Sequence, residues 1–113
     1  MKRTAVRVWL GLALVLLTVA LPVYADTASD LIALFFQVDG TASANQFTDG
    51  ERNSLVVKVI GALRSVNRGD SDSASGQLGA FINQVNALES SGRLSPGDAQ
   101  ALTNAANAII GEL

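Results

Sequence analysis

The residues that most often carry catalysis or bind metals are missing from this chain, which contains no histidine and no cysteine. Their absence excludes imidazole acid–base catalysis, thiol nucleophiles and the usual zinc sites. One Ser–Lys pair is spaced for contact, because Ser54 lies one helical turn before Lys58. An activated serine is the functional interpretation of this pair. A solvated i,i+4 pair on a helix surface is the interpretation that we favour.

Carboxylates offer a second kind of chemistry. Asp70 and Asp72 stand at the first and third positions of a calcium-loop pattern. The pattern then fails, because Ala74 is no ligand, Ser75 replaces the required glycine and Phe81 replaces the final glutamate. We therefore interpret this stretch as a helix-capping loop, and we expect no catalytic residue, no metal and no cofactor.

Exposed aromatic side chains are the remaining means of binding. Trp9 and Tyr24 are the only residues of their types and both precede position 26, so the rest of the chain lacks flat platforms for sugars or bases. Phe36 lies off the main apolar stripe of its segment, and Phe47 lies in an expected loop. Both are candidate partner-binding residues, with packing in the core as the alternative.

The first 25 residues have the parts of a secretory signal peptide. Three basic residues precede an apolar run over residues 8–21, which is shorter than the roughly 18 residues or more of a membrane span. Small residues at Val23 and Ala25 predict cleavage between Ala25 and Asp26. We expect an exported protein, periplasmic or extracellular, with no stable membrane span after cleavage. An uncleaved anchor is the alternative.

Cleavage leaves a single domain over residues 26–113, 88 of the 113 residues. Three of the eight basic residues lie in the signal, so five remain against ten acidic ones and the net charge is about −5. This balance argues against binding of nucleic acid, which needs clustered Lys and Arg. Because no disulfide can form, stability must come from well-packed helices or from association.

The elements that must position these residues are helices, since apolar residues recur with helical spacing and no segment alternates as a strand would. We expect helices over about 28–38, 49–66, 71–90 and 96–113, with a loop over 39–47. The inner face of the first helix is predicted to hold five residues, and Leu34 and Phe36 widen its apolar arc past half the circumference. These five are Ala28, Leu31, Ile32, Phe35 and Val38.

Helix boundaries are marked by capping residues. Thr48 with Glu51 three residues later forms a capping box, and Ser95 before Pro96 begins the last helix. Gly92 ends the third helix as a C′ glycine, and the short connection that follows makes the last two helices antiparallel neighbours. The sequence therefore predicts an all-α fold, a small antiparallel bundle of about four helices.

The last two helices share a set of small and apolar positions on either side of a short glycine turn. These positions are Ala74, Leu78, Phe81, Ile82, Val85, Gly92, Ala99, Leu102, Ala106, Ile109, Ile110 and Leu113. This pattern resembles the FIMAH domain, a C-terminal helical module of exported bacterial hydrolases and other surface proteins. The resemblance extends upstream to Ser54, Leu55 and Lys58, and to residues 31–40. It implies a helical module to which no catalytic residues are assigned.

These observations predict a non-enzymatic exported helical module that acts through protein–protein association, in an accessory or scaffold role. No enzyme is attached to the module here, so we expect a partner in trans: another exported or envelope protein, or a second copy of the chain. A carrier of a small apolar ligand or lipid, with a cavity between the helices, is the alternative.

Overall fold

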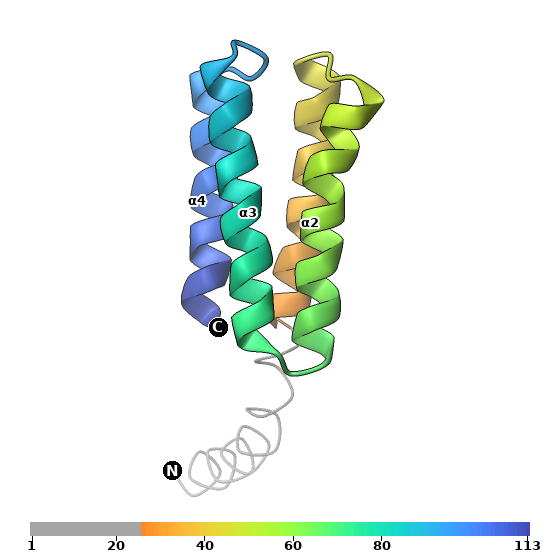
Figure 1. Ribbon diagram of the computed structural model, residues 1–113, viewed down its shortest axis with the longest axis vertical. Coiled ribbons are helices and arrows are strands. Elements are labelled where there is room, and N and C mark those ends of the chain that lie inside the picture. Colours follow the sequence, from red (N-terminus) through yellow and green to blue (C-terminus); the bar gives the residue numbers. More distant parts are fainter. Residues whose placement is uncertain (1–25) are drawn as a thin grey trace, which may run out of the picture.

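The computed structural model describes residues 26–113, nearly all of them in four helices. Residues 26–44 form the first helix, and α2 (Asp49–Asn67), α3 (Ser71–Ser90) and α4 (Pro96–Glu112) follow. Each helix runs antiparallel to the one before it, and no strand occurs within this described segment (Figure 1). The predicted all-α fold, a small antiparallel bundle of four helices, is confirmed.

One hydrophobic core lies between the four helices. Phe81 of α3 is its largest fully buried side chain, and Leu31, Leu55 and Leu102 contribute a fully buried leucine from each of the other three helices. Burying such a side chain is worth about 1.5–3 kcal/mol relative to leaving it in water. All four positions are among those that helical periodicity predicts to face inward.

The first helix is longer than the sequence predicts. It continues to residue 44, through most of the segment expected to be a loop over 39–47, so that expectation is wrong. Gly40 and the small polar residues after it are poor helix formers, and a glycine costs about 1 kcal/mol there. Ala42, however, lies one turn after the buried Val38 and is only 7% exposed. Burial of this extra turn against the core outweighs its weak propensity.

The first helix also turns a slightly different face inward. Leu34 is 1% exposed and belongs to the core, whereas Ile32, predicted to face inward, is 47% exposed. The reason is that the first helix has two neighbours. Leu34 and Gln37 line one pocket together with Ile109 of α4, and Phe35 lines another together with Val59 of α2. The buried face is centred between these neighbours, which leaves Ile32 and Phe36 pointing outward.

The helix boundaries follow the predicted caps. Thr48 Oγ1 accepts a hydrogen bond from Glu51 N (3.1 Å), and Glu51 Oε1 accepts one from Thr48 N (2.8 Å), which completes the capping box before α2. Asp70 caps α3 and Ser95 caps α4 through the same kind of bond. Gly92 follows α3 with φ of 77°, a left-handed conformation that suits glycine. These caps keep the three connections short.

Candidate functional site

The Ser54–Lys58 pair forms a helix-surface contact. Lys58 Nζ donates to the backbone oxygen of Ser54 at 2.8 Å and to its hydroxyl at 3.3 Å. The shorter bond goes to the carbonyl, and the lysine is a donor to the hydroxyl, the reverse of what a base that activates serine must be. This geometry is that of an i,i+4 pair on α2.

Asp70 and Asp72 do not converge on a common point. Asp70 Oδ1 accepts a hydrogen bond from Ser73 N at 3.0 Å, which is the capping interaction at the start of α3, and both aspartates are exposed. Across residues 26–113, no group of three or more His, Cys, Asp or Glu side chains is arranged to hold a metal ion. The Asp70 carboxylate is thus the N-cap of α3.

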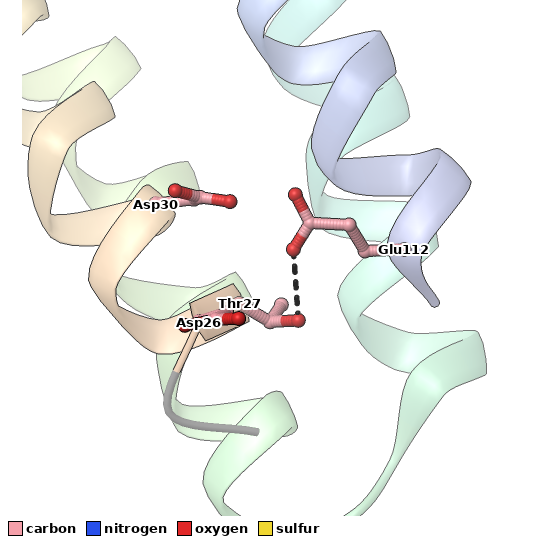
Figure 2. Close-up of a pocket in the computed structure, with 4 residues that line it drawn as sticks. All are labelled: Asp26, Thr27, Asp30 and Glu112. Atoms are coloured by element: carbon pink, nitrogen blue, oxygen red, sulfur yellow. Dashed lines mark hydrogen bonds between the residues drawn. The ribbon is translucent and has the colours of Figure 1, made fainter. Parts of the chain in front are cut away.

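A pocket that the sequence analysis missed lies where the first helix begins and α4 ends (Figure 2). Asp26, Thr27, Asp30 and Glu112 line it, and Thr27 Oγ1 donates to Glu112 Oε1 at 2.9 Å across 85 residues of sequence. The pKa of Glu112 is raised, first by a side-chain hydrogen bond with Asp30 that needs a proton and then by partial burial. Three carboxylates thus share this pocket, and no basic residue of the described chain lines it.

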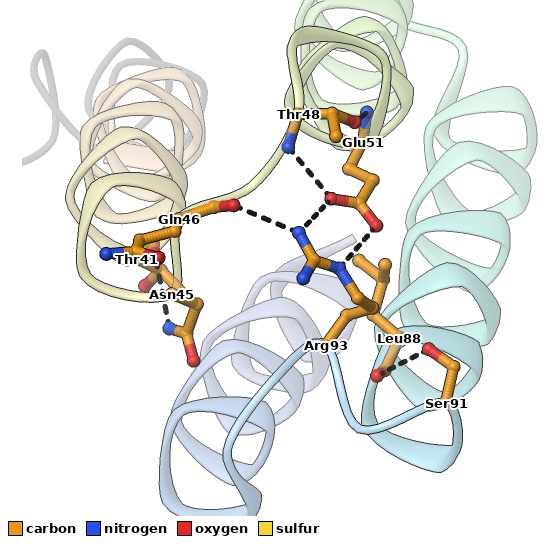
Figure 3. Close-up of polar contacts among 8 residues, drawn as sticks. All are labelled: Thr41, Asn45, Gln46, Thr48, Glu51, Leu88, Ser91 and Arg93. Carbon is orange, nitrogen blue, oxygen red and sulfur yellow. Dashed lines mark hydrogen bonds and ion pairs between the residues drawn. The ribbon is translucent and has the colours of Figure 1, made fainter.

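The opposite end of the bundle is held by polar contacts among Gln46, Thr48, Glu51 and Arg93, here called the loop clasp (Figure 3). Arg93 Nε and Nη2 each donate to one oxygen of Glu51 at 2.9 Å, and Nη2 also donates to the carbonyl of Gln46 at 2.9 Å. Arg93 first, and then the Thr48 backbone, lower the pKa of Glu51 to about 2. The loop clasp joins the two connections at this end.

The candidate functional site is an apolar groove between the first helix and α2, here called the aromatic groove. It has a volume of about 260 Å³, and all its lining residues are apolar. Apolar grooves of this kind bind hydrophobic side chains of partners or small ligands. The lining residues are Leu31, Ile32, Phe35 and Phe36 of the first helix and Val59, Ile60 and Leu63 of α2.

Phe36 is the most exposed part of the aromatic groove. Its residue surface is 65% exposed, while Phe35 next to it is partly buried and packs against the core. The two rings have centroids 5.3 Å apart and planes 80° apart, a favourable edge-to-face arrangement. Phe35 therefore supports the ring of Phe36 while leaving most of Phe36 in contact with water.

Phe47, the second candidate from the sequence, is placed differently. It lies in the connection before α2 and is partly buried against the core. Its backbone N–H donates to Ala42 at 2.9 Å and closes the turn after the first helix. It does not line the aromatic groove. The structure therefore separates Phe47, a residue that packs at a helix end, from Phe36.

Sequence reasoning missed the α2 side of the site. Ile60 and Leu63 line the aromatic groove, and Val57, which precedes Ile60 by one turn, is 59% exposed. Val57 stands in the apolar run Leu55–Val57, where three consecutive apolar residues must point in different directions around a helix. That run was the available signal, because one of its members had to face away from the core.

Charge is uneven along the rim of the aromatic groove. Asp39 of the first helix and Arg52 of α2 form an ion pair with 2.6 Å between Oδ1 and Nε. Arg64 is exposed one turn after Ile60, further along α2, and makes no hydrogen bond or ion pair through its side chain with the other described residues. One end of the groove thus has an ion pair, and the other has an arginine without a partner among residues 26–113.

The predicted signal peptide and Ala25 lie outside the described residues, and Asp26 is the first residue of the described chain. The structure does not bear on the predicted cleavage between them. Over residues 26–113, no helix has the length and apolar character needed to cross a membrane.

The sequence model of the FIMAH domain family matches residues 31–111. The matched region begins in the first helix and ends in the last turn of α4, so it includes α2, α3 and their connections. Comparisons with curated proteins and with solved structures find no match. Because the match spans well over half of the sequence and all four helices, the chain belongs to the FIMAH domain family.

Proposed function

We propose that the protein is a non-enzymatic, exported helical module that acts through protein–protein association, with the aromatic groove as its binding surface. The observation that carries this proposal is the position of Phe36, which is 65% exposed above an entirely apolar groove. Aromatic side chains are enriched where proteins bind one another. A phenylalanine that is mostly in water adds little to the stability of the fold.

The distribution of exposed apolar side chains supports the same surface. Single exposed apolar residues are normal on proteins, so their gathering on one side is the informative feature. Ile32, Phe36 and Val57 are three of the four large apolar residues exposed in the described segment, and all three lie on the first helix or α2. The fourth, Leu113, lies at the far end of the chain.

The rest of the bundle would act as a rigid support for this surface. The loop clasp fixes the connection between the first helix and α2 by bonds from Arg93. Asn45 adds a second tie, because its Nδ2 donates to Asp98 at 2.9 Å and its Oδ1 accepts from Ser95 N at 3.2 Å. Little reorganisation of the two groove helices would then oppose binding.

The predicted signal peptide supports an association outside the cytoplasm. The partner is then another exported or envelope protein, and the module has an accessory or scaffold role there. The family supports the proposal in one respect: the resemblance that led to it concerns modules attached to exported proteins, to which no catalytic residues are assigned.

A carrier for a small apolar ligand is the second candidate, because the groove lining is apolar throughout. Its volume of about 260 Å³ lies just below the roughly 300–1,000 Å³ typical of sites for small ligands. Native mass spectrometry of the protein purified from its own host separates the two functions. A bound apolar molecule that disappears in Phe36→Ser supports the carrier.

Site-specific photo-crosslinking tests the proposed association. Phe36 is replaced by p-benzoylphenylalanine, and the protein is irradiated in the envelope and culture fluid of its host. Asn83, exposed on α3, is the matched control position. We expect a discrete adduct from position 36, weakened by an added Val57→Ser substitution, and none from position 83. Monomer alone at both positions, or equal adducts at both, contradicts the proposal.

A further inference from the structure

The aromatic groove is long enough to hold about two turns of one bound helix. On its α2 side, the exposed residues run from Val57 past Ile60 to Arg64. Seven residues of α-helix rise about 10.5 Å, which is also the distance between side chains i and i+7 of a bound helix. Recognition of a helix in a groove uses anchors at i, i+3 or i+4, and i+7.

The two sides of the groove are matched in height. The Asp39–Arg52 ion pair shows which residues of the antiparallel first helix and α2 lie at about the same height. Phe36 precedes Asp39 by three residues and Val57 follows Arg52 by five, so the two lie about 3 Å apart along the bundle axis. Ile32 and Ile60 are level by the same reasoning. Exposed Phe36 and Val57 therefore lie at one level of the groove, and exposed Ile32 and partly buried Ile60 lie at the next.

The free charge at the rim indicates the chemistry of the occupant. The Asp39–Arg52 pair is already neutralised, whereas Arg64, beside Ile60, has no partner in the described chain. A carboxylate on the occupant, one turn beyond its apolar anchors, would meet Arg64. Such rim charges fix orientation and partner choice more than they add affinity.

A second copy and a lipid surface fit these features less well. A stable interface takes about 20–30 residues from each partner, whereas the aromatic groove with Val57 and Arg64 offers nine. Two copies of a domain with a net charge of about −5 also repel each other, and so do the domain and an anionic membrane. One helix covers a patch of this size.

We infer that the aromatic groove binds a single amphipathic helix of a partner protein, with apolar anchors at i, i+4 and i+7 and a carboxylate that pairs with Arg64. This inference rests on the proposed function and specifies its partner. The apolar anchors contact Ile32, Phe36, Val57 and Ile60, and Arg64 sets the direction in which the bound helix lies.

Fluorescence anisotropy with labelled helical peptides tests the inference on the protein over residues 26–113, which holds all four described helices and their core. The peptides carry Leu at i, i+4 and i+7, with Glu, Gln or Lys one turn before or after these anchors. We expect saturable binding in the order Glu, Gln, Lys, and a loss of about tenfold or more in Phe36→Ser. Arg64→Glu should reverse the order, with a change of about fivefold for the Glu peptide at low salt.

Lys58→Glu is the matched control, because it makes the same change in charge on α2 outside the groove. An equal effect of Lys58→Glu and Arg64→Glu, or no saturable binding of any peptide, overturns the inference. Binding to anionic phosphatidylglycerol vesicles, or dimerisation seen by analytical ultracentrifugation, overturns it if Phe36→Ser abolishes that association. A crosslinked adduct at position 36 without peptide binding supports the proposed function and rules out only the inference that the partner binds through a helix.

Discussion

At the scale of single residues, Gln46 is the only non-glycine residue of the described chain with a positive φ, 55°. It ends the first helix, and the next residue, Phe47, donates its N–H to the carbonyl of Ala42 at 2.9 Å. Gly69 and Gly92 take the same place after α2 and α3, with φ of 74° and 77°. The first helix therefore ends with the same motif as its neighbours but without the residue that suits it.

Gln46→Gly is expected to raise the free energy of unfolding by about 0.5–1 kcal/mol, because a left-handed conformation costs a residue with a side chain more than it costs glycine. The carbonyl of Gln46 that accepts from Arg93 belongs to the backbone and is kept. Urea unfolding measures the difference. Gln100→Gly, at an exposed position within α4, is the control and should lower stability by about 1 kcal/mol. Destabilisation by both substitutions contradicts the prediction.

Glu112 gives a residue-scale prediction of pH dependence. Its pKa in the fold is raised above the ordinary value of 4.5, first by Asp30 and then by partial burial, so the folded state holds the proton more tightly than the unfolded chain. Stability therefore falls as pH rises from about 4.5 through the raised pKa, and it stays lower above it. Glu112→Gln, which resembles the protonated form, should stabilise the fold at pH 7 by less than about 1 kcal/mol.

The comparison needs a neutral Gly-Ser segment before Asp26, so that no terminal ammonium lies beside the acidic pocket. Urea midpoints of the original protein and Glu112→Gln are measured from pH 4 to pH 8. Glu89→Gln on α3 is the matched control for loss of one negative charge. A Glu112→Gln difference that is the same at every pH, or that grows toward acid, shows that the crowding of carboxylates does not matter.

At the scale of elements, the extra turns of the first helix lead to a prediction about Gly40. A Cβ added at Gly40 meets no atom within 4 Å, so Gly40→Ala should gain about 0.5–1 kcal/mol from helix propensity alone. For a domain of this size, 1 kcal/mol corresponds to a rise of about 4–8 °C in Tm. At Gly61 of α2 an added Cβ would come within 2.9 Å of Gln77 Cδ. Gly61→Ala should therefore gain less, and a larger gain there than at Gly40 contradicts the argument.

The orientation of α3 can be tested with two neighbouring positions. Phe81 is 0% exposed, and Asn83, two residues later, faces solvent. Phe81→Ala should cost about 3–5 kcal/mol, which a domain of 88 residues without a disulfide barely tolerates. Asn83→Ala should stay within about 0.5 kcal/mol. Thermal unfolding measures both, and the reverse order would show that α3 faces the other way.

The sequence was sufficient to predict the helices where local signals agree. The box formed by Thr48 and Glu51, the Ser95–Pro96 start and the left-handed Gly92 each mark a boundary within a few residues of sequence. The end of the first helix was missed because Gly40 is a local signal for a loop, whereas burial of Ala42 is a tertiary effect. Local rules cannot weigh a glycine against a core that forms elsewhere.

The candidate site could be predicted only in part, for a related reason. Phe36 was recognised because it lies off the apolar stripe, and it is exposed. Ile32 was expected to face inward, but it is exposed. The direction in which it points depends on how the first helix packs beside both α4 and α2, which the sequence does not reveal. Val57 lies in an apolar run whose outward member periodicity does not single out. The exposure of these side chains is a property of three packed helices.

At the scale of the whole molecule, the two ends of the bundle respond to acid in opposite ways. An even number of antiparallel helices brings Asp26 and Glu112 to one end, and the connections that form the loop clasp to the other (Figure 1). The contact between Thr27 and Glu112 spans 85 residues, so no local pattern could have predicted it. Mild acid relieves carboxylate crowding at the terminal end, whereas stronger acid removes the ion pair at the clasp.

The loop clasp gives the last prediction, on acid unfolding. The pKa of Glu51 is lowered from 4.5 to about 2 by Arg93 and the Thr48 backbone, so its stabilisation is complete above pH 4.5 and is lost as pH falls toward 2. Arg93→Gln should therefore lower the urea midpoint at pH 7, and this difference should shrink between pH 4.5 and pH 2. Arg64→Gln, which removes an unpaired arginine, is the matched control and should show no such loss. Because Glu112 titrates alike in all three proteins, its effect cancels from the differences. A midpoint difference for Arg93→Gln that persists unchanged at pH 2 would show that the clasp acts through packing or through the bond to Gln46, and not through the Glu51 charge.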